Sequence, residues 1–145
     1  LKTQTETSGY ASQKPKPSSD DTNPELAKKL TALMDKERPY LNPELDLNRL
    51  AELLEANPKQ VSYTINRSFS KNFYEYVNSY RIEAFKQSVT KPENKKLTLL
   101  GLAFECGFNS KSTFNDVFKK ATGKTPSQYA KQLKNKSEKK QSVVS

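Results

Sequence analysis

The 145-residue sequence has no histidine, no tryptophan and only one cysteine, Cys106. One cysteine forms no disulfide within the chain, and a chain without histidine builds neither a zinc finger nor a Cys/His or Ser/His catalytic site. No stretch approaches the roughly 20 consecutive apolar residues that span a bilayer, and the first residues lack a basic start followed by an apolar core. We therefore expect a soluble, cytoplasmic protein that binds no metal.

Glycine is also scarce, with four residues, and none of them forms a Gly-rich loop that could cradle a phosphate. The acidic side chains are scattered along segments of helical periodicity rather than gathered into pairs. The sequence thus predicts a protein that is not an enzyme, with no catalytic residues and no cofactor.

Basic residues, in contrast, are plentiful and unevenly distributed. The net charge is +9, and residues 57–134 contain fourteen Lys and Arg against five acids, whereas residues 23–56 contain five against seven. This asymmetry favours a polyanionic partner, because Lys and Arg neutralise phosphates and release their counterions. A surface charged only for solubility has a similar composition, so charge alone leaves both interpretations open.

The two ends of the chain are polar and differ from its middle. Residues 1–22 are rich in Ser, Thr, Lys and Pro and are predicted to be a disordered linker, and residues 135–145 a disordered basic tail. Because the chain starts with Leu1 rather than Met, we expect an upstream sensor or dimerisation region in the full-length protein.

The middle of the chain is predicted to be all-α, with seven helices in two helix-turn-helix subdomains joined by a long connecting helix. Capping residues, Pro, Gly and apolar residues at helical spacing place the helices at 24–38, 47–56, 58–69, 72–89, 99–106, 111–122 and from 126 on. Helix 72–89 is expected to bury one stripe: Phe73, Tyr76, Val77, Tyr80, Ala84 and Phe85. The subdomains are residues 23–71 and 91–134, with residues 72–90 between them.

An internal repeat supports this organisation. At a shift of 52 residues, the pairs are Leu47 with Leu99, Leu50 with Leu102, Ala51 with Ala103, Asn57 with Asn109 and Lys59 with Lys111. At a shift of 53, they are Val61 with Phe114, Ile65 with Phe118, Lys71 with Lys124 and Tyr76 with Tyr129. Each copy is a helix, a tight turn and a second helix, which is typical of a helix-turn-helix unit.

The second helix of each copy has an outward face rich in hydroxyl, amide and basic groups. In the first copy these are Lys59, Ser62, Tyr63, Asn66 and Arg67, and in the second Lys111, Ser112, Thr113, Asp116, Lys119 and Lys120. Such side chains reach base edges in the major groove when they lie at the N-terminal end of a helix. An ordinary solvated helix face has a similar composition, which is the competing interpretation.

Four segments resemble the AraC family of bacterial transcription regulators: residues 40–45 (YLNPEL), 72–81 (NFYEYVNSYR), 107–114 (GFNSKSTF) and 123–129 (GKTPSQY). The resemblance covers about residues 23–134. It implies that two recognition helices enter successive major grooves on one face of double-stranded DNA, about 34 Å apart, and that the connecting helix fixes their separation.

Carried over by position, the resemblance assigns residues to DNA bases and to the DNA backbone. The base-facing residues are Lys59, Ser62, Tyr63, Lys111, Ser112, Thr113 and Asp116. The backbone residues are Asn66, Arg67, Lys71, Lys119, Lys120, Lys124 and Thr125, the last because a helix N-terminus attracts anions. The resemblance implies that the chain binds double-stranded DNA sequence-specifically. It also implies that the chain is the output domain of a larger sensor protein that regulates bacterial transcription. RNA polymerase is expected as a further partner. The sequence leaves open whether the full-length protein is anchored in a membrane through an upstream region.

Four positions leave alternatives open. Asp116 departs from the family pattern, since a carboxylate accepts from a cytosine amine but repels phosphate. Glu55 stands where the second copy has Gly107, so a left-handed backbone there would cost about 1 kcal/mol. Tyr63 either contacts DNA or packs against neighbours, and Cys106 is either a small core residue or a redox sensor.

Two other functions compete with DNA recognition. One is a helical protein-interaction module whose basic face meets an acidic partner. The other is a basic domain that coats anionic lipid or RNA.

Overall fold

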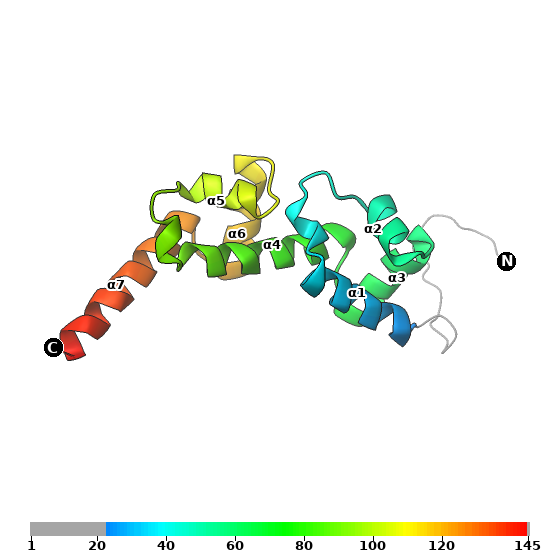
Figure 1. Cartoon of the computed structure of the whole chain (residues 1–145), viewed down its shortest axis with the longest axis horizontal. Coiled ribbons are helices and arrows are strands. Elements are labelled where there is room, and N and C mark those ends of the chain that lie inside the picture. Colours follow the sequence, from blue (N-terminus) through cyan, green and yellow to red (C-terminus); the bar gives the residue numbers. More distant parts are fainter. Residues whose placement is uncertain (1–22, 145) are drawn as a thin grey trace.

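Seven α-helices and no strand make up residues 23–144, the part of the chain that the computed structural model describes, with side chains up to residue 135. The helices are α1 (Pro24–Lys36), α2 (Leu47–Leu54), α3 (Pro58–Phe69), α4 (Phe73–Val89), α5 (Leu99–Glu105), α6 (Lys111–Thr122) and α7 (Pro126–Val144), with 3-10 turns η2 (Pro39–Leu41) and η3 (Pro92–Asn94). Figure 1 shows α1–α3 in one half, α5–α7 in the other, and α4 running between them. The predicted all-α fold of seven helices is confirmed.

Five helices begin at a side-chain cap that the sequence supplies. Oxygens of Asn23, Asp46, Asn57, Thr98 and Ser110 accept hydrogen bonds of 2.8–3.1 Å from backbone N–H groups two or three residues further on. Each cap satisfies a donor that the first helical turn leaves without a partner. The predicted starts of these helices therefore agree with the structure.

The helices that follow α3 and α6 begin with the same reciprocal arrangement. The Asn72 side chain accepts from the Glu75 N–H at 2.8 Å, and the Glu75 carboxylate accepts from the Asn72 N–H at 2.9 Å. Thr125 and Gln128 exchange the equivalent bonds at 3.1 and 3.0 Å. These capping boxes lie 53 residues apart, as the predicted repeat requires.

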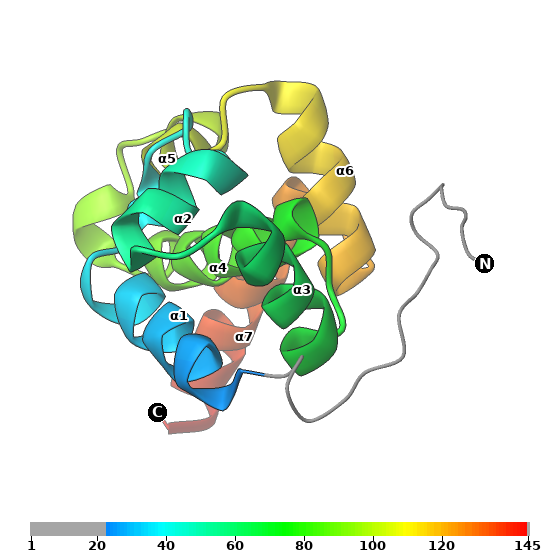
Figure 2. The same ribbon diagram turned by 90° about the vertical axis from the view of Figure 1, so that its right-hand side faces the viewer.

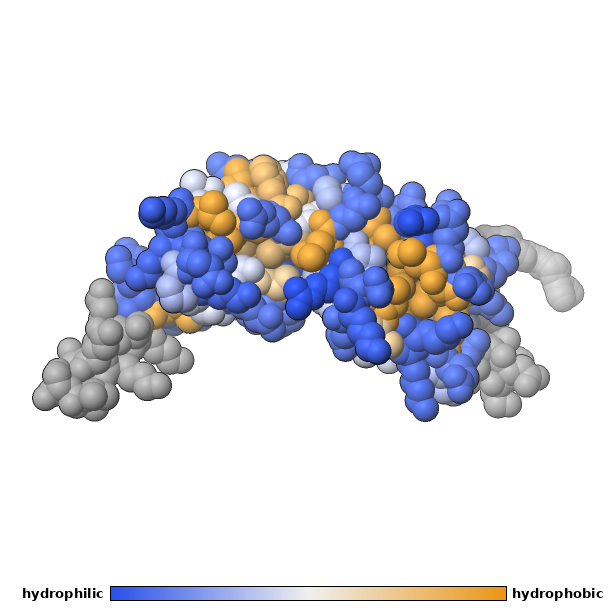
Figure 3. Space-filling model, in the orientation of Figure 1, coloured by the Kyte–Doolittle hydropathy of each residue, from blue (hydrophilic) through white to orange (hydrophobic). Residues whose placement is uncertain are grey.

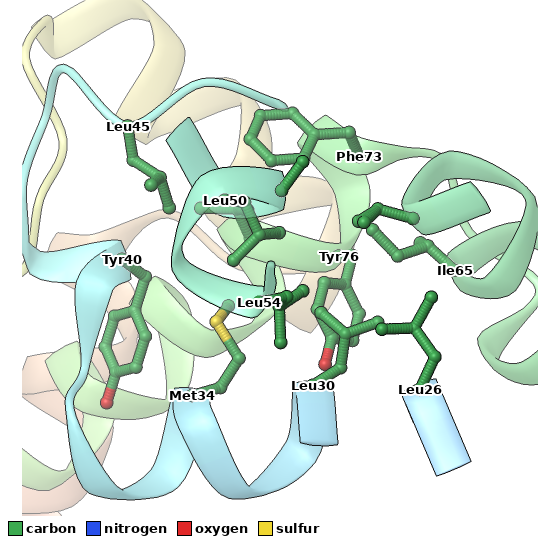
Figure 4. Close-up of a cluster of buried hydrophobic side chains, with 13 residues drawn as sticks. Leu26, Leu30, Met34, Tyr40, Leu45, Leu50, Leu54, Ile65, Phe73 and Tyr76 are labelled. Carbon is green, nitrogen blue, oxygen red and sulfur yellow. The ribbon is translucent and has the colours of Figure 1, made fainter. Parts of the chain in front are cut away.

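The first half has its own hydrophobic core. Figure 4 shows side chains from α1, α2, α3 and the start of α4 directed toward one another, among them Leu30, Met34, Leu50 and Ile65. These four side chains are fully buried. Ala51 is buried as well, and the small side chain lets α2 approach its neighbours closely.

The second half has a separate core built around phenylalanine rings. Phe85 of α4 contacts Phe114 and Phe118 of α6, with ring centroids 4.9 and 5.4 Å apart. Phe118 also contacts Tyr129 of α7 at 5.4 Å. Of the partly buried residues, Ala84 packs against both cores.

Helix α4 buries opposite faces in its two halves. Phe73, Tyr76 and Val77 lie in the first core, whereas Ile82 and Phe85 lie in the second. Because a helix turns by about 100° per residue, Tyr76 and Phe85 point about 180° apart. All six residues of the predicted stripe are buried or half-buried, but the prediction missed the second buried face at Ile82, because α4 serves two cores in succession.

The structure also corrects the register of the repeat. Helices α3 and α6 each have 12 residues, and they begin at Pro58 and Lys111. The shift is therefore 53 from the start of both helices, and the extra residue of the second copy lies in the turn before Ser110. Asn57 corresponds to Ser110 and Lys59 to Ser112, so the predicted pairings of Asn57 with Asn109 and of Lys59 with Lys111 are both wrong.

The turns between the paired helices contain a left-handed residue at equivalent positions. Glu55 has φ 56° and ψ 45°, and its N–H donates to the Ala51 and Glu52 carbonyls, while Gly107 has φ 109°. This conformation is nearly free for glycine but costs about 1 kcal/mol for a residue with a Cβ. The backbone strain considered for Glu55 from the sequence is thus present.

We predict that Glu55→Gly raises the free energy of unfolding by about 1 kcal/mol, because it removes this strain. Urea denaturation followed by circular dichroism measures the change. Glu52→Gly is the matched control, since the same substitution inside α2 should lower stability by about 1 kcal/mol. A loss of stability in both variants would contradict the prediction.

The predictions for the two ends of the chain have different outcomes. Helix α7 continues to Val144, whereas the sequence predicted disorder from residue 135. No Pro or Gly follows Pro126, and the Lys, Gln and Glu of this segment favour helix. The predicted linker 1–22 lies outside the described residues. Among the helices of residues 23–144, none is long and apolar enough to cross a membrane.

Candidate nucleic-acid interface

The second helices of the two units, α3 and α6, lie in different halves of the molecule (Figure 1). Viewed along the long axis, both lie toward the right-hand side and run in a similar direction (Figure 2). Both pack on α4: Phe69 contacts Tyr76 near its start, at a centroid distance of 4.8 Å, and Phe114 contacts Phe85 near its end. One helix therefore holds both candidate recognition helices.

The outward face of α3 is polar and accessible. Lys59, Ser62, Asn66 and Arg67 are exposed, whereas Val61 and Ile65 are fully buried on the opposite side. The predicted division of α3 into a core face and an outer face is confirmed for these residues, and Tyr63 departs from it. Its first turn presents Lys59, whose N–H is already bound by the Asn57 side chain at 2.8 Å.

Tyr63 is placed differently from its neighbours on α3. The residue is half-buried, and its hydroxyl is buried with no hydrogen-bond partner among the described residues. The hydroxyl therefore points into the protein, and only the accessible part of the ring can touch a thymine methyl or a sugar. This geometry favours the packing alternative for the polar end of the side chain.

The outward face of α6 borders a groove of about 450 Å³ between α5, α6 and the start of α7. Of the predicted residues, Lys111, Asp116, Lys119 and Thr125 line this groove. Ser112, Thr113 and Lys120 are exposed on the same helix outside it. The structure thus brings predicted base-facing and backbone-facing residues of the second unit together.

The predicted phosphate contact at the start of α7 is restricted. The Thr125 N–H donates to the Gln128 side chain, and the Lys124 N–H donates to the Thr122 hydroxyl at 3.2 Å. A phosphate would have to displace these internal acceptors, so the Ser127 N–H is the accessible amide of this turn. The side chain of Lys124 is half-buried, as is that of Lys71 at the equivalent position of the first unit.

Cations on both outer faces are available for an anionic partner. The ion pairs among the described residues are Arg49 with Glu52 on α2 and Lys86 with Glu83 on α4. No Lys or Arg of α3 or α6 takes part in either. These side chains can therefore bind phosphates without first breaking an internal pair.

Two further exposed residues belong to this surface by register, and the sequence analysis missed both. Gln60 of α3 corresponds to Thr113 of α6, and Asn115 of α6 corresponds to Ser62 of α3. Asn115 lines the groove beside Asp116. A shift of 53 applied from the helix caps onward would have identified both residues.

Cys106 lies in the second core and is 3% exposed. Burial raises the pKa of its thiol, which keeps the sulfur protonated and poorly reactive. The interpretation as a small core residue therefore agrees with the structure. No cluster of acidic residues and cysteine that could hold a metal occurs in the described part of the chain.

Comparison with known proteins places this geometry in a family. A family described as a helix-turn-helix domain matches residues 50–132. An uncharacterized HTH-type transcriptional regulator of Staphylococcus aureus strain COL is 29% identical over 90 residues, which is 62% of this chain and 12% of that protein. The chain thus spans about an eighth of the length of this relative.

Two solved structures share the fold. The C-terminal domain of the two-component response regulator YesN from Fusobacterium nucleatum is 25% identical, with a TM-score of 0.59 over 71% of this chain and 95% of that one. A DNA-binding transcriptional dual regulator from Escherichia coli K-12 is 20% identical, with a TM-score of 0.61 over 76% of this chain and 99% of that one. Together with the two helix-turn-helix units described above, these matches show that the chain belongs to the AraC-type helix-turn-helix family of DNA-binding transcription regulators.

Proposed function

We propose that the chain binds double-stranded DNA sequence-specifically by inserting α3 and α6 into successive major grooves, and that it has no chemistry of its own. The observation that supports this most is the pairing of two equivalent helices on one connecting helix. Both present exposed hydroxyl, amide and unpaired basic groups on their outer faces. Such faces suit base edges and phosphates.

The dimensions of α4 agree with this mode of binding. Helices α3 and α6 pack on opposite faces of α4, at Tyr76 and Phe85, and these two residues are nine positions or about 14 Å apart along the helix. Successive major grooves on one face of DNA lie about 34 Å apart. The displacement along α4 and the packing on its opposite faces both add to the separation of α3 and α6, and both therefore bring it closer to the spacing of one helical turn.

We further propose that the domain is the output end of a larger bacterial regulator. The Staphylococcus aureus relative is about eight times longer than the region it shares with this chain, which leaves room for a sensor or dimerisation region. In this arrangement the domain acts in the cytoplasm, where the chromosome lies. There it recruits RNA polymerase to a promoter or excludes it.

Titration against duplex DNA tests the proposal. Duplexes selected from a random pool by the purified chain should bind about a thousandfold more tightly than random duplexes, and binding should weaken steeply as salt rises from about 50 to 200 mM. Equal affinity for every duplex, for RNA or for anionic vesicles would support a basic coating domain instead. Binding of an acidic protein but not of DNA would support the interaction module.

Single substitutions should separate base contacts from phosphate contacts. We expect Lys59→Ala or Ser112→Ala to reduce the ratio of selected to random affinity by about 5- to 100-fold, because each removes a donor to a base edge. Lys124→Ala should weaken all duplexes alike and lower the salt slope by about 1. Lys29→Ala, on the exposed face of α1, is the matched control and should change neither value. Equal losses on selected and random DNA for all variants would contradict these assignments.

A further inference from the structure

The two halves of the molecule share little apolar packing. Their cores are separate, and Ala84 packs against both. Helix α4 buries opposite faces in the two cores, so burial of apolar surface holds each half on α4 but does not hold the halves directly on each other. The two halves meet instead at the middle of α4, where a polar contact to the first half lies against the backbone of the second half.

Arg81 is the central residue of α4, with eight residues on either side. Its Nε donates to the Tyr40 carbonyl at 2.7 Å, and its Nη2 donates to the Asn42 carbonyl at 3.0 Å. Its Nη1 donates to the Asn78 side chain at 3.2 Å, which orients the guanidinium from within α4. Arg81 thus ties α4 to the segment around η2, which lies about 40 residues earlier in the chain.

The second half meets the same point through the turn between α5 and α6. A Cβ atom added to Gly107 would clash with the Tyr40 carbonyl oxygen and would lie 2.6 Å from Arg81 Nε. The backbone of Gly107 therefore abuts both partners of the hydrogen bond. Residues of the first half, of α4 and of the second half meet at this junction, which we call the central brace: Tyr40, Asn42, Arg81 and Gly107.

The sequence explains why the Tyr40 carbonyl is available. Its partner in a continued 3-10 turn would be the N–H of residue 43, and Pro43 has none. Among the described residues, Arg81 is in no ion pair, and burial lowers the pKa of its guanidinium. A half-buried cation with no carboxylate partner is held only by the acceptors around it, and the planar fork of arginine matches two carbonyls at once, which lysine does not.

We propose that Arg81 is a positioning residue for DNA recognition. Through the central brace it fixes the angle between α3 and α6. This angle determines how many base pairs separate the two DNA sites that α3 and α6 can occupy at the same time. This inference rests on the proposed function. One base pair more or less between the sites turns the second site by about 34° around the duplex. A rigid brace rejects such a displacement, whereas a loose one tolerates it.

The test compares Arg81→Met with the wild-type chain on three kinds of duplex. These contain two selected sites at the selected spacing, the same sites moved apart by one base pair, or one site alone. The wild type should prefer the selected spacing by about tenfold, and Arg81→Met should reduce that preference to about twofold, with single-site affinity nearly unchanged. Equal losses on all three duplexes would overturn the proposal, because a merely structural role affects every duplex alike.

A second measurement needs no DNA. In a chain carrying Cys106→Ser, spin labels at Glu52→Cys and Glu105→Cys report the distance between the two halves, and both positions are exposed. Arg81→Met should broaden the distribution of this distance, and an unchanged distribution would overturn the proposal. Should Arg81→Met fail to fold, Arg81→Lys gives the same test, since it keeps the charge but cannot reach both carbonyls.

The two measurements distinguish failure of this inference from failure of the proposed function. A wild-type chain that selects no duplex would refute both DNA recognition and the role of Arg81 in spacing. In contrast, a wild-type chain that selects spaced duplexes while Arg81→Met keeps the spacing preference would refute the positioning role alone.

Discussion

Replacing Gly107 by alanine is expected to lower the free energy of unfolding by about 3 kcal/mol or more, which is a large part of the stability of a domain of this size. Two costs combine. The backbone has φ 109°, a conformation that residues with a Cβ rarely adopt, and the new Cβ would collide with the Tyr40 carbonyl oxygen. That oxygen belongs to the backbone and accepts from Arg81, so it cannot move aside cheaply.

Gly123→Ala is the control for this prediction. Gly123 also has a positive φ, 79°, but a Cβ there would meet no atom within 4 Å. The control should therefore lose only about 1 kcal/mol, the cost of the left-handed backbone itself. Urea denaturation of both variants measures the difference, and equal losses would show that the contact with Tyr40 contributes nothing.

Truncating Phe118 to alanine is expected to lower the free energy of unfolding by about 3–5 kcal/mol. The side chain is fully buried, and its ring contacts the rings of Phe85, Phe114 and Tyr129. Removing it leaves a cavity where α4, α6 and α7 meet. Because the ring anchors α6 to α4, selective DNA binding should fall together with stability.

Phe104 provides the matched control. Its side chain is 45% exposed on α5. Figure 3 shows that the face it draws is a mixture of hydrophilic surface and smaller hydrophobic patches. Phe104→Ala should cost only about 1–2 kcal/mol, because nearly half of this side chain is already in water and its loss leaves no enclosed cavity. Similar losses in the two variants, measured by thermal and urea denaturation, would contradict the placement of Phe118 at the centre of the second core.

Local signals predicted most of the fold from the sequence. Asn57 and Ser110 cap their helices through bonds to backbone groups two or three residues away, so a short window of sequence contains the whole interaction. The same holds for Gly123, whose left-handed backbone ends α6. Helix starts and the division of α3 and α6 into inner and outer faces were therefore predictable.

Features that depend on distant residues were not predictable. The carbonyl that Arg81 binds lies 41 residues earlier in the chain, and no local pattern indicates that pairing. The change of buried face along α4 follows from the placement of two cores, and the inward hydroxyl of Tyr63 follows from packing around α3. The list of base-facing residues stays a prediction, with Gln60 and Asn115 added by register.

In the proposed mode of binding, the use of one continuous helix as the spacer limits how this protein can diverge in evolution. Inserting one residue into α4 would rotate α6 by about 100° relative to α3 and advance it by about 1.5 Å. Seven is the smallest number of inserted residues that restores the orientation to within about 20°, and it adds about 10 Å, the length of about three base pairs. Insertions and deletions in this helix therefore cannot change the number of base pairs between the two DNA sites in small steps. Descendants that bind sites at a new spacing must acquire substitutions that bend or loosen the helix.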